Sequence, residues 1–203
     1  MGEFKLIHVI GDSHAESFKG QREVRVHVIG RATAYNLIKD NSTTNSKQKT
    51  LNVMSKIPKG DTVAFVLGEI DCRVHIYQKY LVKDKIISLE TLIDNTINRY
   101  ISFLTQFKEH RIVAVTIPPA GYEGNEFKYP FYGSPEIRAY INQTYNEKLI
   151  EACKKEKLSY VDIYDKIVLP NGLANTRYLR DKIHLNHSAI RLIITELNSL
   201  ETK

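Results

Sequence analysis

The sequence predicts a three-layer α/β/α domain in which a mostly parallel sheet of five strands lies between two layers of helices. Short apolar segments alternate along the chain with longer segments of helical periodicity, an order that is typical of parallel sheets. The apolar segments are nearly continuous in hydrophobic residues, as expected of strands that are covered on both faces.

Strands are expected where β-branched residues are concentrated and a turn residue follows. These segments are residues 4–10, 23–29, 61–67, 111–117 and 158–163. The first three end at Gly11, Gly30 and Gly68, and two prolines stop the fourth. Because the carboxyl ends of parallel strands meet at one edge, we expect these glycine-containing turns at the edge where such sheets bind ligands.

Helices are expected between the strands. They are predicted at residues 15–20, 33–39, 88–107, 136–156 and 186–200. The apolar residues of 88–107 recur at helical spacing, and Asn186 is a suitable N-cap for the last helix. Residues 40–50 are polar throughout and predict a surface loop.

Composition and charge narrow the class of protein. A chain of 203 residues suits one domain, over residues 1–203. The net charge is +6, but its Lys and Arg residues are dispersed, so we expect no nucleic-acid partner. No apolar run is long enough for a membrane span, and no secretory signal is recognisable. The two cysteines form no disulfide framework, so the expected location is the cytoplasm.

Ser13 follows the first predicted strand and precedes a short predicted helix. Its hydroxyl is therefore expected at the edge of the sheet, beside helix N-terminal amides that favour developing negative charge. Serine becomes a nucleophile only with a base within hydrogen-bond reach. The alternative role of Ser13 is that of a helix cap.

Asp181 and His184 are separated by three positions just before the last predicted helix. This spacing allows the carboxylate to hold one ring nitrogen of the imidazole, which leaves the other nitrogen to accept the proton of a serine. The alternative is a turn-forming aspartate and an ordinary loop histidine.

Four segments, in this order, together resemble the SGNH, or GDSL-type, hydrolase family. They are Gly11-Asp12-Ser13-His14, Gly30, Gly68-Glu69-Ile70-Asp71 and Asp181-Lys182-Ile183-His184. The resemblance covers residues 7–187 and implies a flavodoxin-like sandwich of that type. It also implies that Ser13 is the nucleophile, with His184 as its base and Asp181 as the acid of the triad. The backbone N–H groups of Ser13 and Gly30 would form the oxyanion hole.

The third segment departs from the family pattern. The family usually has Gly-x-Asn-Asp there, and its Asn donates to the oxyanion, whereas this chain has Ile70. Losing one such donor costs about 3 kcal/mol in the transition state. The hole then has two backbone donors only, or Arg73 supplies a third, or the enzyme is slow or degenerate. We favour Arg73, because a bidentate pair with Asp71 would fix its geometry; a structural salt bridge is its alternative role.

Further residues at this edge are expected to contact the substrate. They are Asp12, His14, Glu69, Asp71 and Tyr129. The aromatic-rich loop 119–135 is expected to form a lid or binding wall, or else to pack its own aromatic residues on the core. No group of residues has metal-ligand spacing and no nucleotide fingerprint occurs, so neither a metal nor a cofactor is expected.

The resemblance implies hydrolysis of a small acyl ester, acetyl first, on a carbohydrate or another small molecule, through an acyl-enzyme. Three alternatives keep the fold. They are an O-acyltransferase acting on a glycan, a thioesterase or lysophospholipase with an apolar channel, and a catalytically impaired carbohydrate- or partner-binding module. Ile70 is the feature that supports the last. The oligomeric state stays open.

Overall fold

The computed structural model describes residues 6–122 and 130–201. Its centre is a five-stranded sheet with the order β2-β1-β3-β4-β5, and all neighbouring strands are parallel. The strands are β1 (Ile7–Gly11), β2 (Val24–Val28), β3 (Thr62–Val66), β4 (Arg111–Val115) and β5 (Ser159–Val161). All five coincide with predicted segments, so the expected fold class is confirmed.

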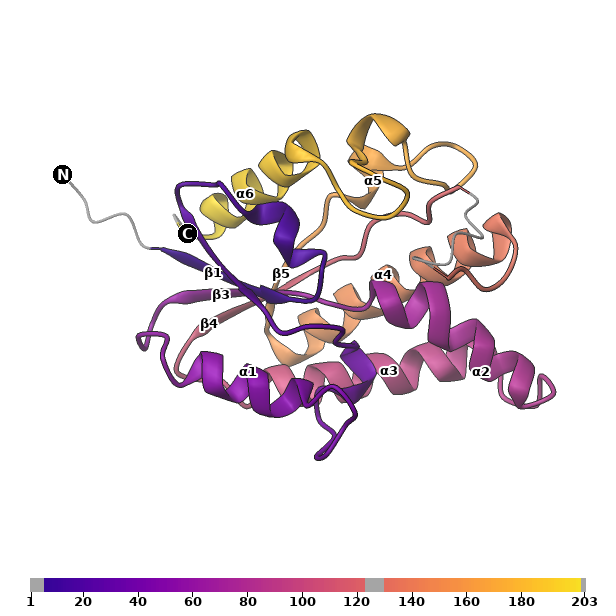
Figure 1. The fold of residues 1–203 in the computed structure, drawn as a ribbon, viewed down its shortest axis with the longest axis horizontal. Helices are drawn as coiled ribbons and strands as arrows, with labels where there is room; N and C mark the ends of the chain where they lie inside the picture. The colour runs from indigo at the N-terminus through magenta and orange to yellow at the C-terminus, as the bar shows by residue number, and fades with distance from the viewer. Residues whose placement is uncertain (1–5, 123–129, 202–203) are drawn as a thin grey trace.

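Helices cover both faces of the sheet (Figure 1). One face carries α1 (Ser46–Met54), α3 (Leu89–Leu104) and α4 (Pro135–Glu156), and α2 (Tyr77–Val82) extends from that layer. The opposite face carries α6 (His187–Glu201), α5 (Tyr164–Ile167) and the 3-10 turn Ala15–Phe18. No helix in the described part of the chain is long and apolar enough to cross a membrane.

Successive side chains of each strand point to opposite faces of the sheet and pack into two separate hydrophobic clusters. Ile10 of β1 and Phe65 of β3 belong to the cluster under α3 and α4. Val9 and Ala64, their chain neighbours, belong to the cluster under α6. Burial on both faces explains why these strands are apolar almost without interruption.

The long helices begin at caps that are visible in the sequence. Ser88 accepts a hydrogen bond from the backbone N–H of Thr91 at the start of α3. Asn186 accepts hydrogen bonds from the backbone N–H groups of Ser188 and Ala189 at the start of α6, which confirms the predicted cap. The predicted helices 15–20 and 33–39 are single 3-10 turns, Ala15–Phe18 and Ala34–Asn36.

Several helical segments in the described part of the chain were not predicted; besides the two longest, they are α5 and the 3-10 turn Thr176–Tyr178. The expected surface loop 40–50 is wrong from Ser46 onward, where α1 begins. The buried face of α1 consists of Ser46, Thr50 and Met54, two of them polar, and the Thr50 hydroxyl donates to the carbonyl of Ser46. Sequence hydropathy therefore gives little signal there. The second segment is a π-helical stretch, Asp71–Ile76, which leads from the end of β3 into α2.

Candidate active site

The four sequence segments meet at the carboxyl edge of the sheet. Ser13 follows β1, Gly30 follows β2, and Glu69 follows β3. His184 lies in the segment before α6, and its Nε2 is 2.9 Å from the Oγ of Ser13. Residues that are 171 positions apart in the chain are thereby in hydrogen-bond contact, and Ser13 remains exposed while His184 is buried.

Asp181 holds the other side of the His184 ring. The Nδ1 of His184 lies 2.8 Å from Oδ2 and 3.0 Å from Oδ1 of Asp181. The same carboxylate accepts the backbone N–H groups of Ile183, at 3.0 Å, and of His184, at 2.8 Å. These backbone bonds fix the turn, so the carboxylate and the imidazole that it orients are parts of one small unit.

The charge state of this unit suits proton abstraction. Burial alone would raise the pKa of Asp181, but the N–H groups of Ile183 and His184 and the His184 ring lower it to about 2. Burial lowers the pKa of His184, and the positive charge of His14 lowers it further, against the opposing effect of Asp181. Near neutral pH, His184 is thus neutral and Asp181 is ionised.

Gly30 and Ser13 offer backbone donors beside the hydroxyl. Neither backbone N–H has a hydrogen-bond partner among the described residues. Gly30 has φ +87°, a conformation that glycine adopts without strain. Asp71 anchors the chain beyond Gly30, because its Oδ2 accepts the N–H of Ala34 at 2.7 Å and its Oδ1 accepts that of Tyr35 at 3.2 Å.

The expected pair between Arg73 and Asp71 is wrong. Arg73 donates from Nε to Oε1 of Glu69 at 2.6 Å and from Nη2 to Oε2 at 3.1 Å, and its Nη1 binds the carbonyl of Pro130 at 2.7 Å. Residues four apart on a helical turn share a face, whereas residues two apart do not. Arg73 would have to leave these partners in order to bind an oxyanion, so its predicted donor role stays a prediction.

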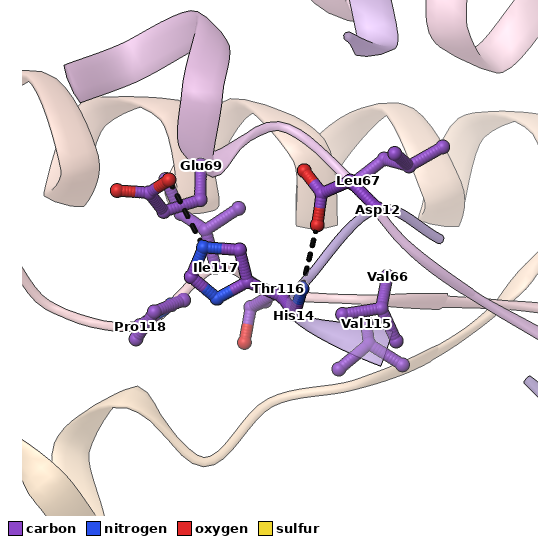
Figure 2. Close-up of a pocket in the computed structure, with 9 residues that line it drawn as sticks. All are labelled: Asp12, His14, Val66, Leu67, Glu69, Val115, Thr116, Ile117 and Pro118. Atoms are coloured by element: carbon purple, nitrogen blue, oxygen red, sulfur yellow. Dashed lines mark hydrogen bonds and ion pairs between the residues drawn. The ribbon is translucent and has the colours of Figure 1, made fainter. Parts of the chain in front are cut away.

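His14 is the second imidazole of the site. Its Nε2 lies 3.0 Å from Oε2 of Glu69, and its backbone N–H donates to Oδ1 of Asp12 at 2.8 Å (Figure 2). Its ring centroid is 4.7 Å from that of His184. Burial opposes a charge on His14, yet Glu69 and Asp12 outweigh it and raise its pKa.

Three carboxylates that were expected to contact substrate are inside the protein. Asp12 and Asp71 are each 1% exposed and Glu69 is 6% exposed. Their oxygens accept hydrogen bonds from the protein itself, so we assign them to positioning rather than to substrate contact. Tyr129 lies outside the described residues. The link from Glu69 to Arg73 was missed, although its four-residue spacing is a sequence signal for such a pair.

His14 is one of the residues that line a small cavity, and Figure 2 shows these residues. The lining residues are Asp12, His14, Val66, Leu67, Glu69, Val115, Thr116, Ile117 and Pro118. The cavity measures about 10 Å³, which is room for one water molecule. Oδ2 of Asp12 is buried without a partner among the described residues, so a water bound there would satisfy it. The cavity is too small for an acyl chain.

Arg138 of α4 holds both ends of the aromatic-rich loop. Its Nη2 donates to the carbonyl of Gly121 at 3.0 Å and its Nη1 to that of Gly133 at 2.7 Å. The guanidinium also lies 4.8 Å from the ring centroid of Phe131. The expected lid spans 119–135, and its residues 123–129 lie outside the described part of the chain, so the lid stays a prediction.

No protein-family model matches the chain, and no curated protein matches it in sequence. Solved structures do match its fold. A proposed acylhydrolase from Bacteroides fragilis is 18% identical with a TM-score of 0.64, over 98% of this chain and 88% of that one. A GDSL-like lipase from Bacteroides thetaiotaomicron is 16% identical with a TM-score of 0.60, over 96% and 87%.

A third similar structure is a catalytic mutant of an acetylxylan esterase from Geobacillus stearothermophilus. It is 13% identical with a TM-score of 0.54, over 96% of this chain and 93% of that one. The chain therefore has the fold of the GDSL-like lipases and acetylxylan esterases, as the resemblance of its four segments implied.

Proposed function

We propose that this protein is a serine esterase that hydrolyses a small acyl ester. The observation that carries the proposal is the continuous hydrogen-bonded series from Ser13 Oγ through the His184 ring to Asp181 at the carboxyl edge of the sheet. A nucleophile, a base and a group that orients the base are the parts that acyl transfer requires.

The reaction would proceed in two halves. Ser13 Oγ attacks the ester carbonyl while His184 Nε2 accepts its proton, and Asp181 stabilises the imidazolium that forms. The N–H groups of Ser13 and Gly30 bind the oxyanion. The imidazolium then returns the proton to the departing alcohol, which leaves the acyl group on Ser13. Water, activated by His184 in the same way, releases the acid.

The proposed acyl group is acetyl, and the proposed substrate class is an acetylated carbohydrate. Three of the similar structures are named for acetylated xylan or its oligosaccharides. The cavity next to His14 is lined neither by Ser13 nor by His184, so its size does not bear on the length of the acyl group. A long acyl chain would have to lie along the exposed side of Ser13.

The test compares wild type with Ser13→Ala on p-nitrophenyl esters from acetate to octanoate. We expect wild-type rates to fall with chain length and the variant to lose at least about 10³-fold in kcat. A fluorophosphonate should label wild type and leave Ser13→Ala unlabelled. Activity that survives in the variant would show that another residue acts as the nucleophile.

One observation favours a second candidate function. Ile70 stands where the family has a donor side chain, so the site would serve a non-catalytic module that binds an acylated carbohydrate or a partner. In that case wild type neither hydrolyses the esters nor reacts with the fluorophosphonate. The hydrogen bond from Ser13 to His184 argues against this candidate, because a binding module has no need of an activated serine.

A further inference from the structure

A buried row of charges runs alongside the triad. Arg73 binds Glu69 through two nitrogens, Glu69 binds the ring of His14, and the ring of His14 lies 4.7 Å from that of His184. The three side chains Arg73, Glu69 and His14 are 6–7% exposed. Burying three charged groups is unfavourable unless each is paired, and here the guanidinium and the imidazole share one carboxylate.

We propose that His14 is a second, charged imidazole of the active site, held by Glu69 beside His184 so that its charge extends the working range of the base to lower pH. This inference rests on the proposed esterase function. His14 is a positioning residue in this scheme, because it acts through His184 and not on the substrate.

The charged groups around the two rings come from three parts of the chain. Asp12, beside β1, faces His14 through the backbone bond at its Oδ1. Glu69 and Arg73 face His14 from the end of β3 and the π-helical stretch. Asp181 and Arg180, both from its own segment, are further titratable groups that face His184 among the described residues.

These neighbours shift the pKa values of the two rings in opposite directions. Glu69 and Asp12 favour a proton on His14, and their combined effect exceeds the cost of burial, so the pKa of His14 rises. A proton on His184 is disfavoured by burial and then by the charge of His14, so the pKa of His184 falls. One ring is thereby kept charged while its neighbour is kept neutral.

The lowered pKa of His184 favours acyl transfer at mildly acidic pH in two ways. A base with a lowered pKa stays unprotonated, and therefore able to accept the Ser13 proton, at a pH where an ordinary histidine is half charged. After it has accepted that proton, the same ring is a stronger acid and donates more readily to a poorly leaving alkoxide such as that of a sugar.

The experiment is the pH profile of kcat/KM for wild type and His14→Gln. The amide of Gln can still donate to Glu69, so the variant removes the charge and keeps one hydrogen bond. Removing a positive charge beside His184 raises the pKa of that ring, so the acid limb should move upward by about half to one pH unit. One unit below the limb, the variant should be about three- to tenfold slower than wild type.

Two further variants sharpen the result. His14→Lys restores a cation that can reach Glu69 and should return the acid limb toward its wild-type position. His187→Gln removes an exposed imidazole at the start of α6 and should leave the limb where it is. An acid limb of His14→Gln that coincides with the wild-type limb, or lies below it, would overturn the inference.

A direct measurement decides the matter without turnover and without altering His14. Histidine-selective NMR titration of Ser13→Ala should show a His14 ring that titrates above 6.5, the ordinary histidine value, and a His184 ring that titrates below it. A His14 ring that titrates below 6.5 would overturn the inference. Failure of the proposed function is seen separately, as absence of Ser13-dependent hydrolysis in wild type.

Discussion

The proposed active site contains two pairs of carboxylate and imidazole that differ in position, in exposure and in the direction of the histidine pKa shift. Asp181 and His184 lie within one turn of the chain, whereas Glu69 and His14 come from different strand ends. Asp181 is 32% exposed and Glu69 only 6–8%. The pKa of His184 is lowered and that of His14 is raised. The same two chemical groups therefore give a base in one place and a fixed cation in the other, and the neighbouring charges make the difference.

We expect the largest effect on activity from a substitution in the pair Asp181 and His184. Asp181→Asn keeps the shape of the turn but removes the charge that orients His184 and stabilises its imidazolium. We expect kcat for p-nitrophenyl acetate to fall by about 10³- to 10⁴-fold. Because the pKa of Asp181 is lowered to about 2 in the folded protein, its charge also stabilises the fold, so activity is compared per folded molecule, and a variant with nearly full activity would refute the triad.

A substitution that affects the pair Glu69 and His14 should instead lower the stability of the fold. Arg73→Ala leaves the buried carboxylate of Glu69 with His14 as its remaining charged partner and removes the bond to Pro130. We expect a loss of about 3 kcal/mol in the free energy of unfolding, measured with urea. Arg191→Ala, on the exposed face of α6, is the control and should be nearly neutral.

The same variant tests the role of Arg73 in the oxyanion hole. If the Arg73 guanidinium supplies the missing donor, kcat of the folded Arg73→Ala protein is about 10²-fold below that of wild type. If its function is to hold Glu69, the folded fraction keeps most of its turnover near pH 8, where His184 is neutral in any case.

A third carboxylate gives the smallest expected effect. Burial raises the pKa of Asp71 to about 7 in the folded protein, above its ordinary value of 3.8. The folded state therefore binds more protons than the unfolded state between these values, and stability is lost as pH rises through that window. Relative to Asp71→Asn, wild type should lose about 1 kcal/mol from pH 6 to pH 7, measured by urea unfolding at each pH. An equal pH dependence in both proteins would show that Asp71 is ionised throughout.

The sequence predicted the parts of the molecule that follow from simple burial. Strands that are covered on both faces must be apolar, so all five were found, and their turn residues located the edge where Ser13 and Gly30 lie. The local motif of Asp181 and His184 was equally visible, because its geometry needs only one turn of chain.

The parts that were missed depend on tertiary contacts. The first turn of α1 reads as a loop because Ser46 and Thr50 are buried by the fold and not by their own hydropathy. Arg73 was given the wrong partner, because its four-residue spacing from Glu69 indicates a pair only where the chain is helical, and the helical stretch 71–76 follows closely on a strand end.

The two carbonyls that accept hydrogen bonds from Arg138 determine how freely the length of the segment between them can change. With Gly121 and Gly133 fixed on one guanidinium, the chain between them starts and ends at set points. Doubling the length of such a closed segment costs only about 0.6 kcal/mol in chain entropy. Changes in the length of this segment would therefore cost little stability, and Ser13, His184 and Asp181, which lie on other elements, would keep their positions.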